Sequence, residues 1–170
     1  IPCHENFQKT MNGFYNRYEP LSYSFDVEGN WETISSFLEH IFGSNYEIGL
    51  DYLTLLWQRP TQILPVLCLV SEERNTGKTT FLNLLKILFE GNMTINTNEN
   101  FRSPFNSDWA GKLIIAVDEV LLDKREDTER IKNLSTAKHY KVESKGKDRE
   151  ESEFFGKFIL CSNNEDNFIK

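Results

Sequence analysis

The amino-acid sequence predicts an α/β fold in which a central, mainly parallel β-sheet is flanked by helices. Three short apolar runs carry this prediction, because each has the length of a buried strand and ends abruptly in polar residues. The runs are residues 65–70, 113–117 and 158–161. Helical patterns fill much of the sequence between them, as in folds that alternate strands with crossover helices.

Composition narrows the class of protein. The chain has 170 residues, which is long enough for one domain with a sizeable core. Its residues are 39% hydrophobic and 26% charged, as is ordinary for a globular protein. The net charge of −7 argues against a broadly basic surface that binds nucleic acid. Any DNA contact is therefore expected on a local loop or pore rather than across a whole face.

The cysteines indicate a reducing compartment. Cys3, Cys68 and Cys161 are widely spaced and odd in number, which predicts free thiols and a cytoplasmic protein. Cys3-His4 has no second ligand pair nearby, so no metal site is assigned there. No secretory signal is visible, and the apolar runs are far shorter than the ~20 residues of a membrane span. Because the chain begins at Ile1 rather than Met, we expect a piece of a longer protein.

The first third of the chain divides into two expected segments. Residues 1–30 show turn formers but no clear period, and are interpreted as an irregular leader or linker. Residues 31–62 form a helical segment with two helices, one from Trp31 to Ile41 and one from Tyr46 to Trp57. Asn30 is the expected N-cap of the first, Gly43 lies just past its end, and Pro60 stops the second. The remaining 63–170 are expected to form the core.

A strand–loop–helix unit suited to phosphate opens this core. The apolar run ends in a polar loop, the loop ends in Gly77-Lys78-Thr79-Thr80, and a helical pattern follows at once. Backbone N–H groups from Asn75, Thr76 and Gly77 through Thr80 are expected to surround an anion at the helix N-terminus. Lys78 would reach the outer phosphates, and the Thr79 hydroxyl would bind Mg²⁺.

One residue departs from the P-loop pattern G-x-x-x-x-G-K-[ST]. The pattern has glycine where this chain has Glu72. Its carboxylate must point to solvent or lie beside Arg74, since it would otherwise repel a nucleotide. The alternative interpretation is a surface turn that only caps a helix.

The helix that follows the loop, residues 81–89, is apolar most of the way round, which predicts a buried helix. Gly91 is its expected C-cap, and residues 93–96 are expected to form a short strand. Residues 97–109 are polar and rich in turn formers.

The second apolar run ends in Asp118-Glu119. Ligands bind at the carboxyl ends of parallel strands, so these acids are candidates for the site. Asp118 would hold Mg²⁺ and Glu119 would act as general base toward water. Alternatively the pair merely ends a strand. The third run ends near Asn163, which could orient the attacking water, although asparagine at a strand end is usually a turn residue.

The only basic cluster lies in residues 138–149, after a short charged helix at 127–134. It alternates like a strand and contains Lys145-Gly146-Lys147, a candidate hairpin tip for sequence-independent phosphate contacts. A solvated hairpin is the alternative, and the acids that follow at 150–153 dilute the positive field.

The order of these motifs, across residues 31–167, resembles the superfamily 3 helicases, a branch of the AAA+ P-loop ATPases, and most of all the primase–helicases of phages and mobile elements. Gly77-Lys78-Thr79 is similar to Walker A and Asp118-Glu119 to Walker B. Residues 142–148 resemble the additional family motif, Ser162-Asn163 resembles sensor 1, and residues 105–112 are typical of the phage proteins.

The resemblance implies an ATP- and Mg²⁺-dependent DNA helicase that assembles as a ring, usually a hexamer, with a primase domain upstream. The helical segment 31–62 resembles the family's oligomerisation region. A phage-encoded member would act in the cytoplasm of its bacterial host. It implies that Lys78, Glu119 and Asn163 are catalytic, and that Lys145 and Lys147 grip single-stranded DNA in the pore. No arginine finger is assigned within the chain. Alternatives are another AAA+ machine or nucleotide switch, and a non-catalytic assembly or DNA-binding module, which Glu72 would favour.

Overall fold

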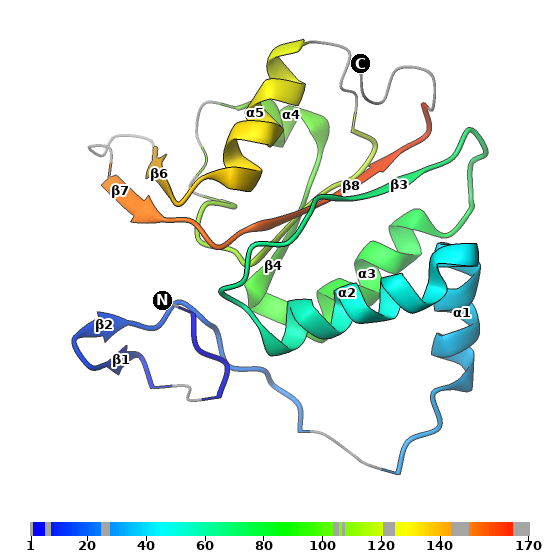
Figure 1. The fold of residues 1–170 in the computed structure, drawn as a ribbon, viewed down its shortest axis with the longest axis horizontal. Coiled ribbons are helices and arrows are strands. Elements are labelled where there is room, and N and C mark those ends of the chain that lie inside the picture. The colour runs from blue at the N-terminus through cyan, green and yellow to red at the C-terminus, as the bar shows by residue number, and fades with distance from the viewer. Residues whose placement is uncertain are drawn as a thin grey trace.

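The computed structural model describes residues 2–5, 8–24, 28–103, 106, 108–120, 125–143 and 150–164. At its centre lies a four-stranded sheet in which all neighbours run parallel, in the order β3-β8-β5-β4 (Figure 1). The strands are β3 (Leu67–Val70), β8 (Lys157–Ser162), β5 (Ile114–Val117) and β4 (Met93–Asn96). The prediction of an α/β fold with a mainly parallel sheet is therefore confirmed, as is the short strand at 93–96.

Helices cover both faces of this sheet (Figure 1). One face carries α1 (Glu32–Phe42), α2 (Tyr46–Gln58) and α3 (Lys78–Phe89), and the other carries α4 (Asn98–Arg102) and α5 (Arg125–Thr136). Alternate residues of β5 enter two separate apolar clusters: Ile114 packs with the α3 side and Ile115 with the α4–α5 side. The burial of both faces explains why the strand sequences are continuously apolar.

Strand β3 differs from the prediction of burial on both faces. It lies at an edge of the sheet and pairs only with β8. Leu69 is buried, whereas Leu67, Cys68 and Val70 are half-buried. The apolar run predicted a strand correctly, but a pattern of apolar residues does not show which strand lies at the edge of the sheet.

The two helices before β3 agree with the predicted pattern. Helix α1 begins at Glu32, so its N-cap is Trp31 rather than the predicted Asn30, although the Asn30 side chain accepts the Glu32 N–H at 2.8 Å. Gly43 follows its last residue with φ 53°, a conformation that favours glycine. A short 3₁₀ turn, η1 (Gly43–Asn45), leads into α2. The boundaries 31–62 and 63–170 stay predictions, since nothing tests them as domains.

Helix α3 corrects two expectations. Only one of its faces is buried, through Phe81, Leu82, Leu85 and Phe89, whereas Ile87 is 70% exposed. The residue that caps it is Glu90, with φ 44°, rather than Gly91. Gly91 lies inside the 3₁₀ turn η2 (Glu90–Asn92), where glycine leaves room for a side chain from the leader.

The described part of the leader contains one short hairpin in an otherwise irregular chain. Two short antiparallel strands, β1 (Thr10–Met11) and β2 (Phe14–Tyr15), are joined by Asn12-Gly13, both with positive φ, as in a type I′ hairpin. These strands are too short to produce a visible period in the sequence.

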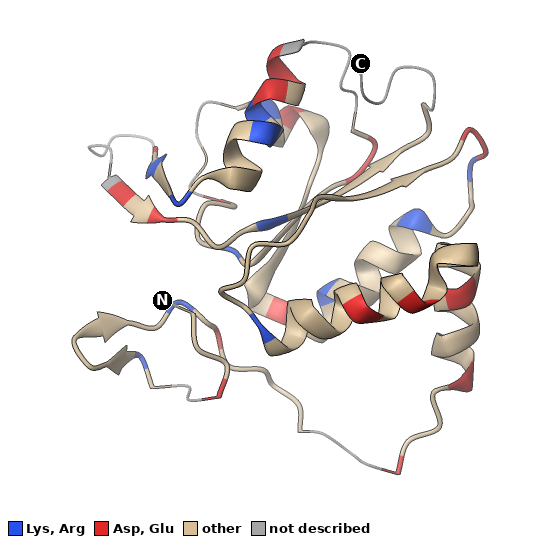
Figure 2. Cartoon of the chain, in the orientation of Figure 1, with Lys and Arg blue, Asp and Glu red and all other residues tan. Residues whose placement is uncertain are grey.

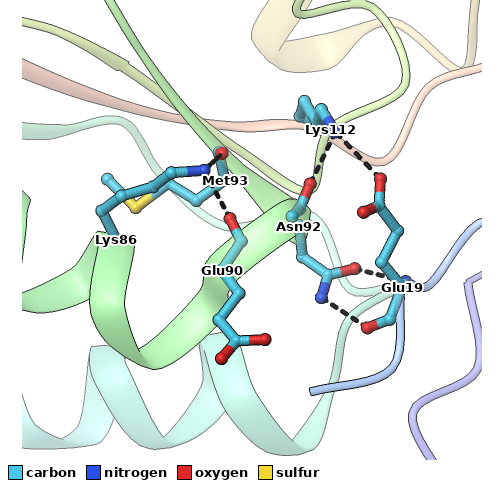
Figure 3. Close-up of polar contacts among 7 residues, drawn as sticks. Glu19, Lys86, Glu90, Asn92, Met93 and Lys112 are labelled. Atoms are coloured by element: carbon cyan, nitrogen blue, oxygen red, sulfur yellow. Dashed lines mark hydrogen bonds and ion pairs between the residues drawn. The ribbon is translucent and has the colours of Figure 1, made fainter. Parts of the chain in front are cut away.

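The chain after this hairpin docks at the amino ends of β4 and β5 (Figure 3). The Asn92 side chain exchanges two hydrogen bonds of 2.8 Å with the backbone of Glu19. Lys112 pairs with the Glu19 carboxylate at 3.0 Å and donates to the Gly91 carbonyl at 2.6 Å. Ser22 of the leader donates hydrogen bonds to the Glu90 carboxylate, and these bonds lower the pKa of that carboxyl. The leader therefore binds to the end of α3 through several polar contacts.

The region after β4 contains a helix that the polar sequence concealed. Helix α4 begins with a reciprocal capping box between Thr97 and Asn100. The expected basic hairpin is present as β6 (His139–Val142) paired antiparallel with β7 (Glu150–Glu153). Its predicted DNA-binding tip, Lys145 and Lys147, lies outside the described residues.

All three cysteines are free, as predicted, with Cys161 buried and Cys68 half-buried. Among the helices described, none combines the length and hydrophobicity that crossing a bilayer requires.

Candidate functional site

The carboxyl ends of β3, β8 and β5 meet around one cavity of about 550 Å³. This is the edge where open α/β sheets bind ligands. The lining residues come from the loop after β3, the start of α3, and the ends of β5 and β8: Arg74, Asn75, Thr76, Gly77, Lys78, Thr79, Thr80, Asp118, Glu119, Cys161, Ser162 and Asn163.

The structure brings together almost every residue that the sequence singled out. The three predicted catalytic residues, Lys78, Glu119 and Asn163, line this cavity, as do the predicted nucleotide-binding residues 75–80. Asp118 and Thr79, the predicted metal ligands, line it too. Lys145 and Lys147 are the exceptions, because they fall outside the described part of the chain.

The loop between β3 and α3, residues 71–77, turns through two residues with positive φ. Asn75 has φ 60° and Gly77 has φ 94°. Asparagine tolerates this left-handed region and glycine enters it freely. The turn delivers the chain into α3, whose first intrahelical bond runs from the Phe81 N–H to the Gly77 carbonyl at 2.8 Å. The unpaired N–H groups of the helix start therefore belong to residues that line the cavity.

Glu72 stands apart from the cavity. Its side chain is exposed, and it does not belong to the lining. It is also absent from the residues with positive φ, so the backbone here does not require glycine. The expectation that its carboxylate points to solvent agrees with this exposure.

Lys78 is held by hydroxyl groups rather than by an acid. Its Nζ donates to Ser71 Oγ at 2.6 Å and to Thr76 Oγ1 at 3.0 Å. Within the described residues, no ion pair involves Lys78. Its ammonium charge therefore remains available to an anion in the cavity.

Two carboxylates at the end of β5, those of Asp118 and Glu119, line the same cavity as this cation. Thr79 Oγ1 donates to Asp118 Oδ2 at 2.9 Å, which joins the start of α3 to the neighbouring strand end. Asp118 Oδ1 accepts the N–H of Glu119 at 3.1 Å. Glu119 itself has φ 53°, an uncommon conformation for a residue with a side chain and one that recurs at functional sites.

The cavity includes residues that sequence reasoning did not select. Cys161 lies buried on β8, one strand from Asp118, and burial raises the pKa of its thiol to about 12. The charge of Asp118 adds to the rise and Lys78 opposes it. A thiol with this pKa stays protonated and does not act as a nucleophile. The position of Cys161-Ser162 just before Asn163 was the available signal.

Charge is unevenly distributed around the loop. Figure 2 shows acidic residues along the loop before α3 and a basic segment where that helix begins. Lys78 provides this positive charge, and both Lys78 and Arg74 of the loop line the cavity. The positive groups thus line the cavity while Glu72 lies outside its lining.

A second cavity of about 480 Å³ adjoins the first, between the α1–α2 region and the outer edge of β3. It shares Thr76 and Lys78 with the first cavity and is lined on the helical side by His40, Asn45 and Tyr52. The loop therefore lies between two cavities, one polar and one flanked by the first two helices.

Comparison with known proteins identifies one family and several similar folds. The model of a "Family of unknown function (DUF5906)" matches residues 69–170, more than half of the chain. The apo structure of the NrS-1 C-terminal region (305–718) superposes with a TM-score of 0.77 at 24% identity, over 88% of this chain and 38% of that one. The A form of the same region gives a TM-score of 0.79 at 23% identity, over 95% and 41%. No curated protein matches significantly.

The superpositions show a shared fold, and at identities below 25% they show the fold alone. The chain spans about two fifths of the length of the solved structures it matches. The chemistry must therefore be argued from the cavity itself.

Proposed function

The chain belongs to DUF5906, a family of unknown function, and we propose that it is the ATPase core of a superfamily 3 helicase, an AAA+ P-loop module that couples ATP hydrolysis to movement on single-stranded DNA. The observation that carries the proposal is the convergence of Lys78, Asp118, Glu119 and Asn163 on one cavity at the carboxyl edge of a parallel sheet. These groups come from one helix start and two strand ends, in the order that helicase motifs follow.

The triphosphate of ATP would lie against the 71–77 loop and the first turn of α3. Free N–H groups at a helix N-terminus and a nearby ammonium group both favour phosphate. Lys78 would leave its two hydroxyl partners and bind the outer phosphates. Exchange of neutral partners for a charged one favours this movement.

The residues at the cavity fit Mg²⁺. Thr79 Oγ1 and Asp118 Oδ2 lie 2.9 Å apart, and both are oxygen donors of the kind Mg²⁺ prefers. Mg²⁺ usually takes one or two protein ligands and completes its shell with phosphate oxygens and water. When bound here, the ion would offset the negative charge of the phosphates.

Glu119 would accept a proton from the water that attacks the γ-phosphorus, while the bond to the bridging β–γ oxygen breaks. Asn163 would hold that water in line through its amide. Lys78 would stabilise the charge on the transferred group, which is the main task of a protein in phosphoryl transfer. Two observations support this role: Glu119 lines the cavity, and its left-handed backbone is a conformation that recurs at functional sites.

Movement on DNA is the finer part of the proposal. Lys145 and Lys147 would contact the strand from the tip that connects β6 to β7. A homo-oligomeric ring, usually a hexamer, would bring these tips together in a pore in the cytoplasm, with a primase domain upstream as a further element. The matched structures are much longer than this chain, which agrees with a module within a larger machine.

A second candidate is a nucleotide-dependent switch that binds ATP without rapid hydrolysis. The hydrogen bonds of Lys78 to Ser71 and Thr76 favour it, because they hold the lysine in its own loop. Breaking them would offset part of the energy gained from the nucleotide.

Turnover of ATP separates the two candidates. We expect Glu119→Gln to bind Mg-ATP as the wild type does but to release phosphate about 100-fold more slowly, the lower part of the range for a lost general base. Lys78→Ala should lose binding itself. Glu47→Gln, the same change at an exposed position on α2, is the control. Wild-type binding without phosphate release would favour the switch, and no binding of Mg-ATP would reject the nucleotide site.

Single-stranded DNA binding tests the helicase assignment. The double variant Lys145→Ala, Lys147→Ala should weaken binding to an oligonucleotide and reduce the salt dependence by about one to two counterions. Lys9→Ala, in the leader, is the matched control. An unchanged affinity and salt dependence would remove the DNA-binding role of the tip.

A further inference from the structure

Helix α1 packs directly against the 71–77 loop. A Cβ added to Gly77 would lie 3.2 Å from both Phe37 Cε2 and Ile41 Cδ1, closer than a comfortable contact. Gly77 also has φ 94°, which side chains rarely adopt. Glycine at position 77 thus serves two purposes: it adopts the positive φ of the loop, and its lack of a side chain lets α1 pack close to the backbone.

A hydrogen bond adds direction to this packing. His40 Nε2 lies 3.1 Å from the Thr76 carbonyl oxygen, and since a carbonyl only accepts, the Nε2–H must donate. Phe37, His40 and Ile41 are spaced by three and four residues, so they share one face of the helix. That face therefore meets the loop through two apolar side chains and one directional bond.

Thr76 joins this contact to Lys78. Its carbonyl is held by His40, and its hydroxyl receives the Lys78 ammonium at 3.0 Å. Ser71 Oγ lies 3.1 Å from the same hydroxyl and 2.6 Å from Lys78 Nζ. Tilting the Thr76 peptide would alter both the direction of its side chain and the start of α3. A continuous set of contacts thus runs from α1 to Lys78.

We propose that α1 holds the 71–77 loop in the shape that accepts phosphate, with His40 as the positioning residue that fixes the Thr76 carbonyl. The proposal rests on the proposed function, because it assigns regulation to the same nucleotide site. It gives the helical segment before β3 a role in ligand binding: a change in the position of α1 changes the affinity of the loop for phosphate.

Two substitutions of His40 and one control substitution elsewhere test the positioning role of His40. His40→Ala removes the donor, and we expect Mg-ATP to bind about threefold to tenfold more weakly, the value of one hydrogen bond. His40→Gln carries an amide N–H near the former position of Nε2 and should restore affinity to within about twofold. His139→Ala makes the same change at an exposed histidine on β6 and should have no effect. The melting temperature should fall by about 2–4 °C in His40→Ala, the equivalent of one hydrogen bond, and stay within about 1 °C in the other two.

The readouts separate a positioning role from a structural one. Unchanged affinity in His40→Ala, or equal weakening in His40→Ala and His40→Gln, would overturn the proposal. Hydrogen exchange of the amides of residues 76–78 gives a second readout without nucleotide: it should accelerate in His40→Ala and recover in His40→Gln. If the wild type binds no Mg-ATP, the proposed function fails, and hydrogen exchange alone then decides whether α1 controls the loop.

Discussion

The two ends of the central sheet are both polar, but they use their polar groups in opposite ways. At the amino ends of β4 and β5, Glu19, Asn92 and Lys112 pair with one another and with backbone (Figure 3). At the carboxyl ends, Lys78 and Glu119 line an open cavity instead. Groups that satisfy one another stabilise a fold, whereas groups that converge on a cavity can bind a ligand. The amino end should therefore govern stability, and the carboxyl end should govern binding.

The buried lysine at the amino end of β8 gives the largest expected effect. Lys157 is 3% exposed, and its Nζ donates to the Pro60 carbonyl. None of the ion pairs among the described residues involves Lys157. Burial lowers the pKa of Lys157 from 10.5 to about 8. At pH 7 the buried ammonium group therefore destabilises the folded protein. Lys157→Met removes this charge and should raise the free energy of unfolding by about 3 kcal/mol.

The sign of the pH dependence follows from this lowered pKa. The wild-type penalty is complete below about pH 8 and disappears as the pH rises toward 10.5, where the unfolded lysine also loses its proton. The stability difference between Lys157→Met and wild type should therefore shrink between these values in urea unfolding. Cys161, with a raised pKa, titrates in both proteins and cancels from the difference. A difference independent of pH would contradict the charge argument.

A matched pair of asparagines compares the two ends directly. Asn92 is 3% exposed and makes two hydrogen bonds with the backbone of Glu19, so Asn92→Ala should cost about 2 kcal/mol of stability by leaving that backbone unpaired. ATP binding should not change. Asn163 is exposed at the cavity, and Asn163→Ala should slow hydrolysis while stability stays within about 0.5 kcal/mol. Chemical unfolding measures the stability of each variant, and phosphate release measures its ATP hydrolysis. Slower hydrolysis in Asn92→Ala, or lower stability in Asn163→Ala, would contradict the division between the two ends.

Asp118 probes the carboxyl end with a smaller expected change in free energy. Asp118→Asn keeps an oxygen that can accept from Thr79 but removes the charge that would favour Mg²⁺. We expect Mg-ATP affinity to fall about tenfold, as for loss of one charged hydrogen-bonding partner, with little change in stability. ATP affinity without Mg²⁺ should be nearly the same in both proteins. An equal loss with and without Mg²⁺ would reject the metal role.

The carboxyl end was the part of the molecule that sequence could predict. Apolar runs that stop at Asp118 and before Asn163 identify strand ends, and parallel strands must bring their ends together. The amino end was invisible, because Glu19 and Asn92 are distant in the chain and neither belongs to a periodic pattern. The exposed Ile87 was missed for a related reason: apolar spacing locates a helix but does not show how far its neighbours extend.

Glu72 offers the smallest effect and tests the one departure from the P-loop pattern. Positive φ in this loop falls on Asn75 and Gly77, so glycine at 72 would relieve no strain. Any effect of Glu72 on ATP should therefore come from its charge. Glu72→Gly and Glu72→Gln should both raise ATP affinity about twofold at low salt, and the gain should vanish at high salt because exposed charges are screened. A larger gain for Glu72→Gly than for Glu72→Gln, persisting in salt, would show that loop flexibility limits binding instead.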